Sequence, residues 1–229
     1  MQLQLRKFCA WGMAAEVTAA LLGNAAVSLA AGGWTITQLT SNGLNNGYQA
    51  VSGSNVVWCT RPQSGDHEVF LFDGTTTRQI TDNSVDEWDV SVSGDCIIWR
   101  AWDGHDDEIY VYEDGGIVNV SANSYADRQP TLGGGRAAWT GYHIDGWGSD
   151  LEIFCREVDG STTRWTDNRL YDTGVRVSDR ATAWLQHDGE DFEVVYHAGT
   201  TLQHTTHNDS LNESDQVLPG AAAAWLGPA

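Results

Sequence analysis

The sequence predicts an all-β fold, a β-propeller of four-stranded antiparallel blades, from three marks that recur about every forty residues. The first mark is a pair of Val, Ile, Ala or Thr residues followed by Trp, and the second is Thr or Ser two positions before Asn. The third is Asp-x-Glu ahead of a run of apolar residues. The recurring residues of the first two marks are Trp58, Trp99, Trp139, Trp184 and Trp225, and Asn42, Asn83, Asn123, Asn168 and Asn208. Marks that recur at nearly the same spacing indicate homologous units.

Each unit divides into four short strand candidates separated by turn residues. In the second unit these candidates are residues 90–93, 96–101, 108–113 and 117–121. They are rich in Val, Ile, Tyr and Trp and are bounded by Gly, Asp and Ser, which is typical of strands. Apolar residues at consecutive positions, as in the run CIIW, indicate strands covered on both faces. We therefore interpret each unit as a blade, with the recurring Trp filling the space between neighbouring blades.

One stretch of the sequence also resembles a known family. Residues 78–115 contain an Ile-Thr-x-Asn, a Ser-x-Ser-Gly-Asp turn, an Ile-x-Trp strand and an Asp-Gly-x-x-x-Glu-Ile-Tyr hairpin. This pattern resembles the WD-repeat-like (WD40-like) blade of TolB-like propellers, and the likeness extends over about residues 36–229. In that family these positions are framework, so the resemblance implies a fold and an exported location rather than a reaction. The α/β domain that precedes the TolB propeller has no counterpart in this sequence, so TolB's own partner is not carried over.

The number of blades is left with two interpretations. Four full units are followed by a fifth, in which residues 216–226 supply the first two strands, and residues 34–40 have the pattern of a last strand. Pairing of the two ends would complete a fifth blade except for its third strand, and would close a five-bladed ring. The alternative is a truncated propeller of the six-bladed kind that the resemblance implies.

Residues 1–31 have the pattern of a signal-peptide-like leader. Arg6 and Lys7 precede a stretch without charge from Val17 to Ala31, with small residues suited to cleavage near its end. We therefore expect a periplasmic or secreted protein, with the propeller at residues 34–229. The alternative is an Ala-rich helix packed on the domain. No stable membrane insertion is expected once the leader is removed, because the stretch is too short and too polar for a membrane span.

Charge and cysteine content narrow the possible partners. The chain has 31 acidic and 12 basic side chains, a formal net charge of −19, and no Lys/Arg-rich run. Nucleic acid and anionic membrane surfaces are therefore excluded as expected partners, and we expect a monomer. Beyond the leader the sequence has Cys59, Cys96 and Cys155 in apolar runs, which predicts buried free thiols and at most one disulfide.

Topology predicts where a ligand would bind. In a four-stranded meander, the connections between blades and the loops between the second and third strands emerge on the same face. We call this side the loop face. Its loops carry aromatic residues that are not shared between units, and the predicted ligand-binding residues are Tyr48, Trp88, Trp102, Tyr142, His143 and Trp147. An acidic, aromatic surface of this kind suits a glycan or a protein partner. The alternative, expected for about half of these rings, is that they cap the blade cores.

The Asp-Gly hairpins permit a second interpretation, as Ca²⁺ sites. Several carboxylates lie close together in them, and the candidate ligands are Asp103, Asp106, Glu108, Asp145 and Asp150. We favour a structural role, in which Asp-Gly forms the turn and the Glu holds backbone amides, because every unit carries a copy. No other cofactor is expected.

No motif of a catalytic nucleophile, metalloprotease or phosphate-binding loop is found in the sequence. The seven histidines share no position in the repeat. The first hypothesis is therefore an exported, non-catalytic propeller that binds a protein partner or a glycan on its loop face. The alternatives are the propeller, or a propeller fragment, of a polysaccharide lyase or hydrolase, and a calcium-stabilised structural module.

Overall fold

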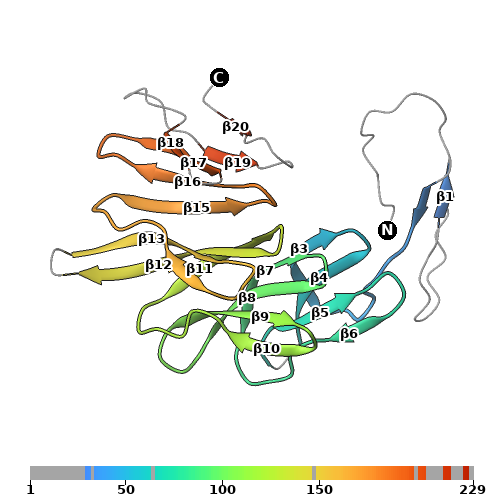
Figure 1. Cartoon of the computed structure of the whole chain (residues 1–229). Helices are drawn as coiled ribbons and strands as arrows, with labels where there is room; N and C mark the ends of the chain where they lie inside the picture. Colours follow the sequence, from blue (N-terminus) through green and yellow to red (C-terminus); the bar gives the residue numbers. More distant parts are fainter. Residues whose placement is uncertain are drawn as a thin grey trace. The chain divides into compact units, whose positions relative to one another are not determined.

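The computed structural model describes residues 29–31, 34–62, 65–145, 148–198, 201–204, 214–217 and 224–226, and side chains within 36–62, 65–143 and 150–198. The regular elements in these ranges are all strands, as predicted (Figure 1). The chain divides into two compact units, Met1–Gly43 and Leu44–Ala229. In the described part of the chain, no helix is long and apolar enough to span a membrane. The predicted leader lies largely outside the described residues.

The second unit contains four consecutive four-stranded antiparallel sheets, each with its strands in chain order. Blade 1 has β3 (Asn45–Ser52), β4 (Asn55–Arg61), β5 (Glu68–Phe72) and β6 (Thr77–Gln79), and blade 2 has β7 (Glu87–Ser93), β8 (Cys96–Trp102), β9 (Asp107–Glu113) and β10 (Gly116–Asn119). Blade 3 has β11 (Asp127–Gly133), β12 (Arg136–Asp145), β13 (Gly148–Arg156) and β14 (Thr162–Arg164), and blade 4 has β15 (Tyr171–Val177), β16 (Ala181–His187), β17 (Phe192–Ala198) and β18 (Thr201–His204). The predicted four-stranded meander is confirmed in all four blades.

The first strands of successive blades lie side by side, since β3 contacts β7, β7 contacts β11, and β11 contacts β15. The series continues with β19 (Ser214–Val217), which contacts β15 and pairs with β20 (Ala224–Leu226). In the first unit, β1 (Leu29–Ala31) pairs with β2 (Trp34–Ile36), the segment predicted to close the fifth blade. Among the described strands no pairing joins β2 to β19 or β20, so the number of blades stays a prediction.

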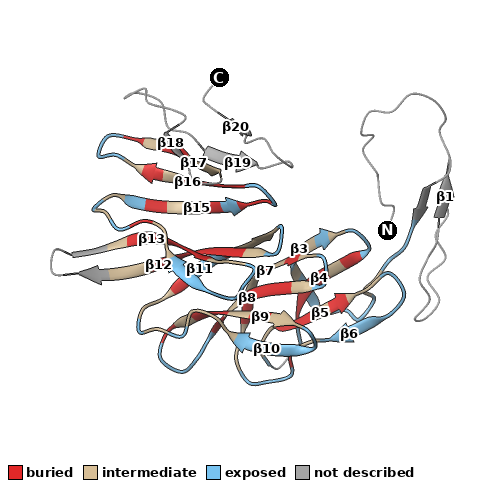
Figure 2. Cartoon of the chain, viewed as in Figure 1, coloured by how far each residue is buried: buried red, intermediate tan, exposed pale blue. Residues whose placement is uncertain are grey.

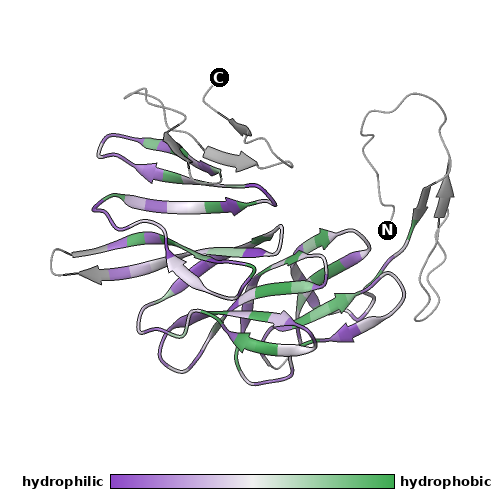
Figure 3. Cartoon of the chain, viewed as in Figure 1, coloured by the Kyte–Doolittle hydropathy of each residue, from purple (hydrophilic) through white to green (hydrophobic). Residues whose placement is uncertain are grey.

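Neighbouring blades share hydrophobic cores, and blades 2 and 3 each share one with the blade on either side. Ile97 and Trp99 pack with residues of blade 1, whereas Ile98 packs with Trp139 of blade 3. Consecutive side chains of a strand point to opposite faces of the sheet, so a run such as Cys96–Trp99 serves two separate cores. Figure 2 shows the buried positions along the strands, and Figure 3 shows that hydrophobic stretches are most extensive on the strands of blades 1 and 2. The sequence-based expectation that both sheet faces are covered is confirmed.

The recurring tryptophans of the four blades are buried, and Trp99, Trp139 and Trp184 pack in the cores between blades, as predicted. Trp58, Trp99, Trp139 and Trp184 are all at most 5% exposed. In the first three blades, the indole stacks on an aromatic ring of the adjacent strand at centroid distances of 5.9 to 6.2 Å. In blade 4, Val195 lies opposite Trp184, and the stacking ring is replaced by a smaller side chain.

The recurring asparagine joins one blade to the next through carboxylates. The backbone N–H of Asn123 donates to Glu108 of blade 2 at 2.9 Å, and its side-chain amide donates to Asp127 of blade 3. Both carboxylates are fully buried. The same pair of bonds is made by Asn83 with Glu68 and Glu87, and by Asn168 with Glu152 and Asp172. The Glu of the Asp-x-Glu mark therefore accepts a hydrogen bond from a backbone amide at Glu68, Glu108 and Glu152, as the structural interpretation expects.

Burial raises the pKa of five carboxyl groups that bond these asparagines: Glu87, Glu108, Asp127, Glu152 and Asp172. The pKa of Glu87 is raised to about 8, chiefly by burial and further by the nearby Glu68, while hydrogen bonds from Asn83 and Thr81 oppose the rise. Burial likewise raises the pKa of Asp127 to about 7, against the hydrogen bond that it accepts from Asn123. We call the contact of each recurring Asn with its two carboxyl groups an asparagine junction. At neutral pH the Glu87 carboxyl group is therefore largely protonated in the folded protein.

Candidate ligand-binding face

The first strand of every blade contains a β-bulge near the end that meets the loop face. The register shifts between Gly47 and Ala50 in β3, and at the corresponding places in β7, β11 and β15. The residues with positive φ at these bulges are Tyr48 (53°), Asp89 (55°), Gln129 (53°) and Gly174 (63°). A left-handed conformation costs a non-glycine residue about 1–2 kcal/mol, so the blades hold three strained side chains at equivalent positions. Bulges redirect side chains, and here they collect polar and aromatic groups at the strand ends.

Two arginines and two carboxylates form a cluster across blades 2 and 3. Arg100 donates from Nη1 to Asp107 at 2.7 Å and from Nε to Asp89 at 3.1 Å. Arg128 of blade 3 approaches the same Asp107 with an Nε to Oδ2 distance of 3.6 Å. Arg100 is largely buried and held on two sides, whereas half of the Arg128 side chain is exposed. Arg128 is thus the arginine of this pair with donors available to a ligand.

Each of these arginines also lies over an aromatic ring of the loop face. The Arg100 guanidinium is 4.8 Å from the centroid of Trp88, and that of Arg128 is 5.6 Å from the centroid of Tyr142. Contacts of this kind attract a cation to the face of a ring and fix the orientation of both groups. Together with Asp89 and Asp107 they form a row of four charged groups with an aromatic ring at each end. We call it the arginine–aromatic row: Trp88, Asp89, Arg100, Asp107, Arg128 and Tyr142.

A small pocket of about 110 Å³ lies at the blade 4 end of this row. Its lining is Arg128, Gln129, Thr140, Tyr142, Leu151, Tyr171 and Thr173. Gln129 spans the two blades, because its side-chain oxygen accepts from the Thr173 hydroxyl at 3.1 Å and from the Gly174 N–H at 3.2 Å. Tyr171 is 42% exposed, and partial burial beside the Tyr142 phenol raises its pKa. The pocket offers a guanidinium, an amide and two phenols to a polar ligand.

The structure distributes the predicted ligand-binding residues unevenly. Trp88 and Tyr142 belong to the arginine–aromatic row, and Trp102 is 44% exposed at the end of β8. Tyr48 is exposed in blade 1, where its ring meets His67 edge-on at 6.0 Å. His143 is half-buried and packs edge-on against Tyr125, in keeping with the alternative of a core cap. Trp147 lies outside the described residues.

Sequence reasoning missed the two arginines and Gln129. A signal for the arginines was present, because they are two of only 12 basic residues in a chain with 31 acidic ones. The sequence contains no corresponding signal for Gln129, because its hydrogen bonds to blade 4 depend on the β-bulge in β11.

Of the predicted metal ligands, three are brought together. Asp103, Asp106 and Glu108 each place a carboxylate oxygen within 4.8 Å of the others. A second group of the same form, Asp188, Asp191 and Glu193, lies in blade 4. Asp103 also accepts from the N–H groups of His105 and Asp106, the turn-forming role expected of Asp-Gly. Asp150 is half-buried and belongs to neither group, and the side chain of Asp145 lies outside the described residues.

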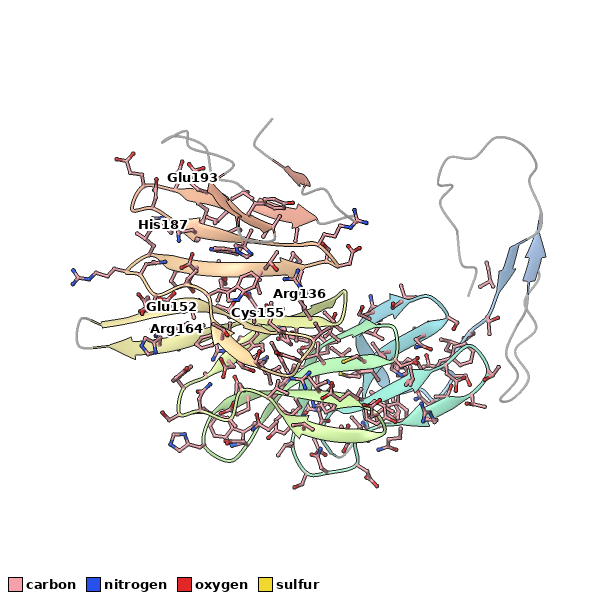
Figure 4. The ribbon with its side chains drawn as sticks, in the orientation of Figure 1. Arg136, Glu152, Cys155, Arg164, His187 and Glu193 are labelled. Atoms are coloured by element: carbon pink, nitrogen blue, oxygen red, sulfur yellow. The ribbon has the colours of Figure 1, made fainter. Side chains whose placement is uncertain are left out.

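A larger cavity of about 500 Å³ lies between blades 3 and 4, on the side opposite the loop face. It is lined by Glu157, Thr163, Arg164, Trp165, Trp184 and His197. The ring centroids of Trp165 and His197 lie 4.5 Å apart, with the two ring planes tilted by 59°. The Cζ atom of Arg136 lies 5.9 Å from the centroid of the Trp165 ring. Burial and the charge of Arg136 lower the pKa of His197. Figure 4 labels Arg136, Cys155 and Arg164 on the strands of blade 3. Trp184 lines this cavity, and the residue opposite Trp184 is Val195, at the position where the first three blades have an aromatic ring.

The fold has counterparts among solved structures. Acylaminoacyl peptidase from Pyrococcus horikoshii aligns with a TM-score of 0.56 and 13% identity, over 76% of this chain and 28% of that chain. The β-propeller domain of the Trilobed protease from Pyrococcus furiosus aligns with a TM-score of 0.57 and 11% identity, over 76% of this chain and 57% of that one. The CRINKLY WD40 ectodomain of the Arabidopsis thaliana receptor kinase ACR4 aligns with a TM-score of 0.53 and 8% identity, over 81% and 65%.

No protein-family model and no curated protein matches the sequence, so the resemblance to TolB-like propellers in particular stays a prediction. The chain spans about a quarter to two thirds of the length of the structures named above. At these identities the likeness establishes the fold alone. The four sheets, their order in the chain and their neighbours among solved structures together show that the chain has the β-propeller fold, with blades of the WD40-like kind.

Proposed function

We propose that the chain is an exported, non-catalytic binding module that takes a glycan on its loop face. The observation that carries the proposal is the arginine–aromatic row ending in a pocket lined by Arg128, Tyr142 and Tyr171. Sugars present hydroxyl groups around an apolar ring face, so stacking phenols beside a guanidinium and an amide match them chemically. Export rests on the leader pattern of residues 1–31.

A panel of neutral and acidic polysaccharides, titrated by calorimetry, tests this proposal. Arg128→Ala and Tyr171→Ala should each weaken binding about tenfold or more, since each removes a contact in the pocket. Arg180→Ala is the matched control for the arginine, because Arg180 is exposed on a turn of the opposite face. Binding that survives both pocket variants would contradict a site at this pocket.

A protein partner is the second candidate, favoured by the exposed aromatics Tyr48 and Trp102 outside the pocket. The variant Tyr48→Ala distinguishes a glycan ligand from a protein partner. The affinity for a glycan in the pocket of blades 3 and 4 should be unchanged by this substitution in blade 1. The affinity for a protein that covers the loop face should fall. The peptidases and the protease among the structural neighbours also support a third candidate, the propeller part of a hydrolase. Release of product from any polysaccharide or peptide substrate by the purified chain would replace the non-catalytic proposal.

A further inference from the structure

The loop between β16 and β17 gathers three carboxylates in blade 4. Asp188, Asp191 and Glu193 each place one carboxylate oxygen within 4.8 Å of the other two. Asp191 and Glu193 are 4% and 3% exposed. Figure 4 labels Glu193 and His187 on the two strands that this loop connects. Mutual repulsion at such spacing in a buried place is unfavourable unless a positive charge compensates it.

A second observation concerns Asp191 alone. Both of its carboxylate oxygens are buried and have no hydrogen-bond partner. The hydrogen bonds of the turn use other atoms: the Asp191 N–H donates to the Asp188 carboxylate at 3.2 Å, and the Asp188 N–H donates to the Asp191 carbonyl at 3.1 Å. The turn therefore does not require the Asp191 side chain. Because buried polar groups are almost always paired, a carboxylate with two unpaired oxygens directed among other carboxylates points to a missing cation.

Comparison with blade 2 sharpens the assignment. The sequence Asp-Gly-His-Asp at residues 103–106 corresponds to Asp-Gly-Glu-Asp at residues 188–191. In blade 2, the Nδ1 atom of His105 lies 3.1 Å from one carboxylate oxygen of Asp106. In blade 4 the same position holds Glu190, which adds negative charge instead. Blade 4 thus combines the same carboxylate geometry with no cationic side chain on Asp191 in the described part of the chain.

The chemical type of the three ligand groups indicates which metal ion this site would bind. All three groups are carboxylates, which are hard oxygen ligands that favour Ca²⁺ or Mg²⁺ over zinc or copper. Ca²⁺ accepts a larger and less regular set of oxygen ligands than Mg²⁺, and it suits ligands drawn from a loop and an adjoining strand. We propose that Asp188, Asp191 and Glu193 bind a Ca²⁺ ion, which fixes the loop between β16 and β17. This site does not depend on the proposed glycan pocket, which is formed by other residues.

Calcium titration of the purified chain, stripped of metal with EGTA, tests the assignment by calorimetry and by thermal melting. Saturable binding and a rise in melting temperature with Ca²⁺ are expected, because an ion bound only by the folded state stabilises it. Asp191→Asn should weaken Ca²⁺ binding about tenfold or more and should raise the melting temperature in EGTA, where it removes an uncompensated charge. A purely structural carboxylate would give the opposite sign in EGTA. Asp179→Asn, at an exposed turn, is the control and should change neither value.

Glu190→His gives a second variant that leaves the buried residues intact, since Glu190 is exposed. It places the blade 2 residue beside Asp191 and should weaken Ca²⁺ binding while the chain stays folded. Absence of any Ca²⁺-dependent heat or melting shift at millimolar Ca²⁺ would overturn the proposal. Full Ca²⁺ affinity in Asp191→Asn, or loss of affinity in Asp106→Asn alone, would overturn its placement in blade 4.

Discussion

The side-chain amide of Asn123 donates to the carboxyl group of Asp127 at 2.6 Å, four residues further along the chain. The backbone N–H of the same asparagine reaches back to Glu108 in the preceding blade. One residue thus satisfies two buried acidic groups that belong to different sheets, and the arrangement recurs at Asn83 and Asn168.

Replacement of Asn123 by Ala should therefore destabilise the protein by about 1–3 kcal/mol, because Asp127 loses its amide donor in a fully buried place. Equilibrium urea unfolding measures the change. Asn45→Ala, at an exposed position at the start of β3, is the control and should lie within about 0.5 kcal/mol of the parent. Equal effects of the two substitutions would contradict the role of the asparagine junction.

The raised pKa values at the junctions predict a stability that falls as pH rises. Glu87, with a pKa of about 8 against a usual 4.5, and Asp127, with about 7 against 3.8, keep their protons in the folded state where the unfolded chain has released them. Their stabilising effect is full below the unfolded pKa values and is lost as pH rises through the folded ones. In EGTA, the melting temperature should fall between pH 5 and pH 8.5.

Glu87→Gln provides the control for this dependence, since glutamine imitates the protonated acid and does not titrate. Its melting temperature should change less with pH than that of the parent. A melting temperature of the parent that climbs over the same interval would show that these groups are ionised in the folded protein.

The cavity beside Trp184 predicts a stabilising substitution. Val195→Phe supplies the ring that stacks on the recurring tryptophan in the first three blades and should gain about 0.5–1.5 kcal/mol. Val194→Phe is the matched control: Val194 is fully buried on the other face of the same strand, and a larger side chain there should cost about 1–3 kcal/mol. Unfolding free energies that change in the same direction for both variants would contradict this explanation of the cavity.

The described cysteines are free, as predicted, and two of them should be unreactive. Burial raises the pKa of both Cys59 and Cys155 to about 12, so almost no thiolate is present at pH 8. Iodoacetamide followed by peptide mass spectrometry should find them unmodified in the native protein and fully modified in urea. Rapid native labelling of either residue would show that the blades open locally at its strand.

Most of the fold could be predicted from the repeat of about forty residues in the sequence. The turns, the strand runs and the tryptophan between blades could be found because each unit repeats the same physical requirement for burial. The acids at Glu87, Asp127 and Asp172 were missed, although each lies four residues after the recurring asparagine. Their role depends on a bond between sheets, and only the regular spacing could have indicated it.

The candidate site was harder to predict than the fold for a geometric reason. Strand alternation fails at the bulges, so the directions of Trp88, Asp89 and Gln129 do not follow from the sequence pattern. Pairing across blades, as between Arg128 and Asp107, depends on the distance between sheets that the repeat does not encode. Of the predicted ligand-binding residues whose side chains are described, Tyr142 alone lines the pocket, and ligand binding on the loop face stays a prediction.

The division of Ile97 and Ile98 between two cores has a consequence for how such a chain can be shortened or lengthened. An isolated sheet from this protein would contain half of each of two hydrophobic cores and neither core in full, so it should not fold by itself. Conversely, a duplicated segment of one whole repeat would bring both halves with it. Growth in whole units, rather than by insertion within a strand, is the change in length that this architecture can absorb.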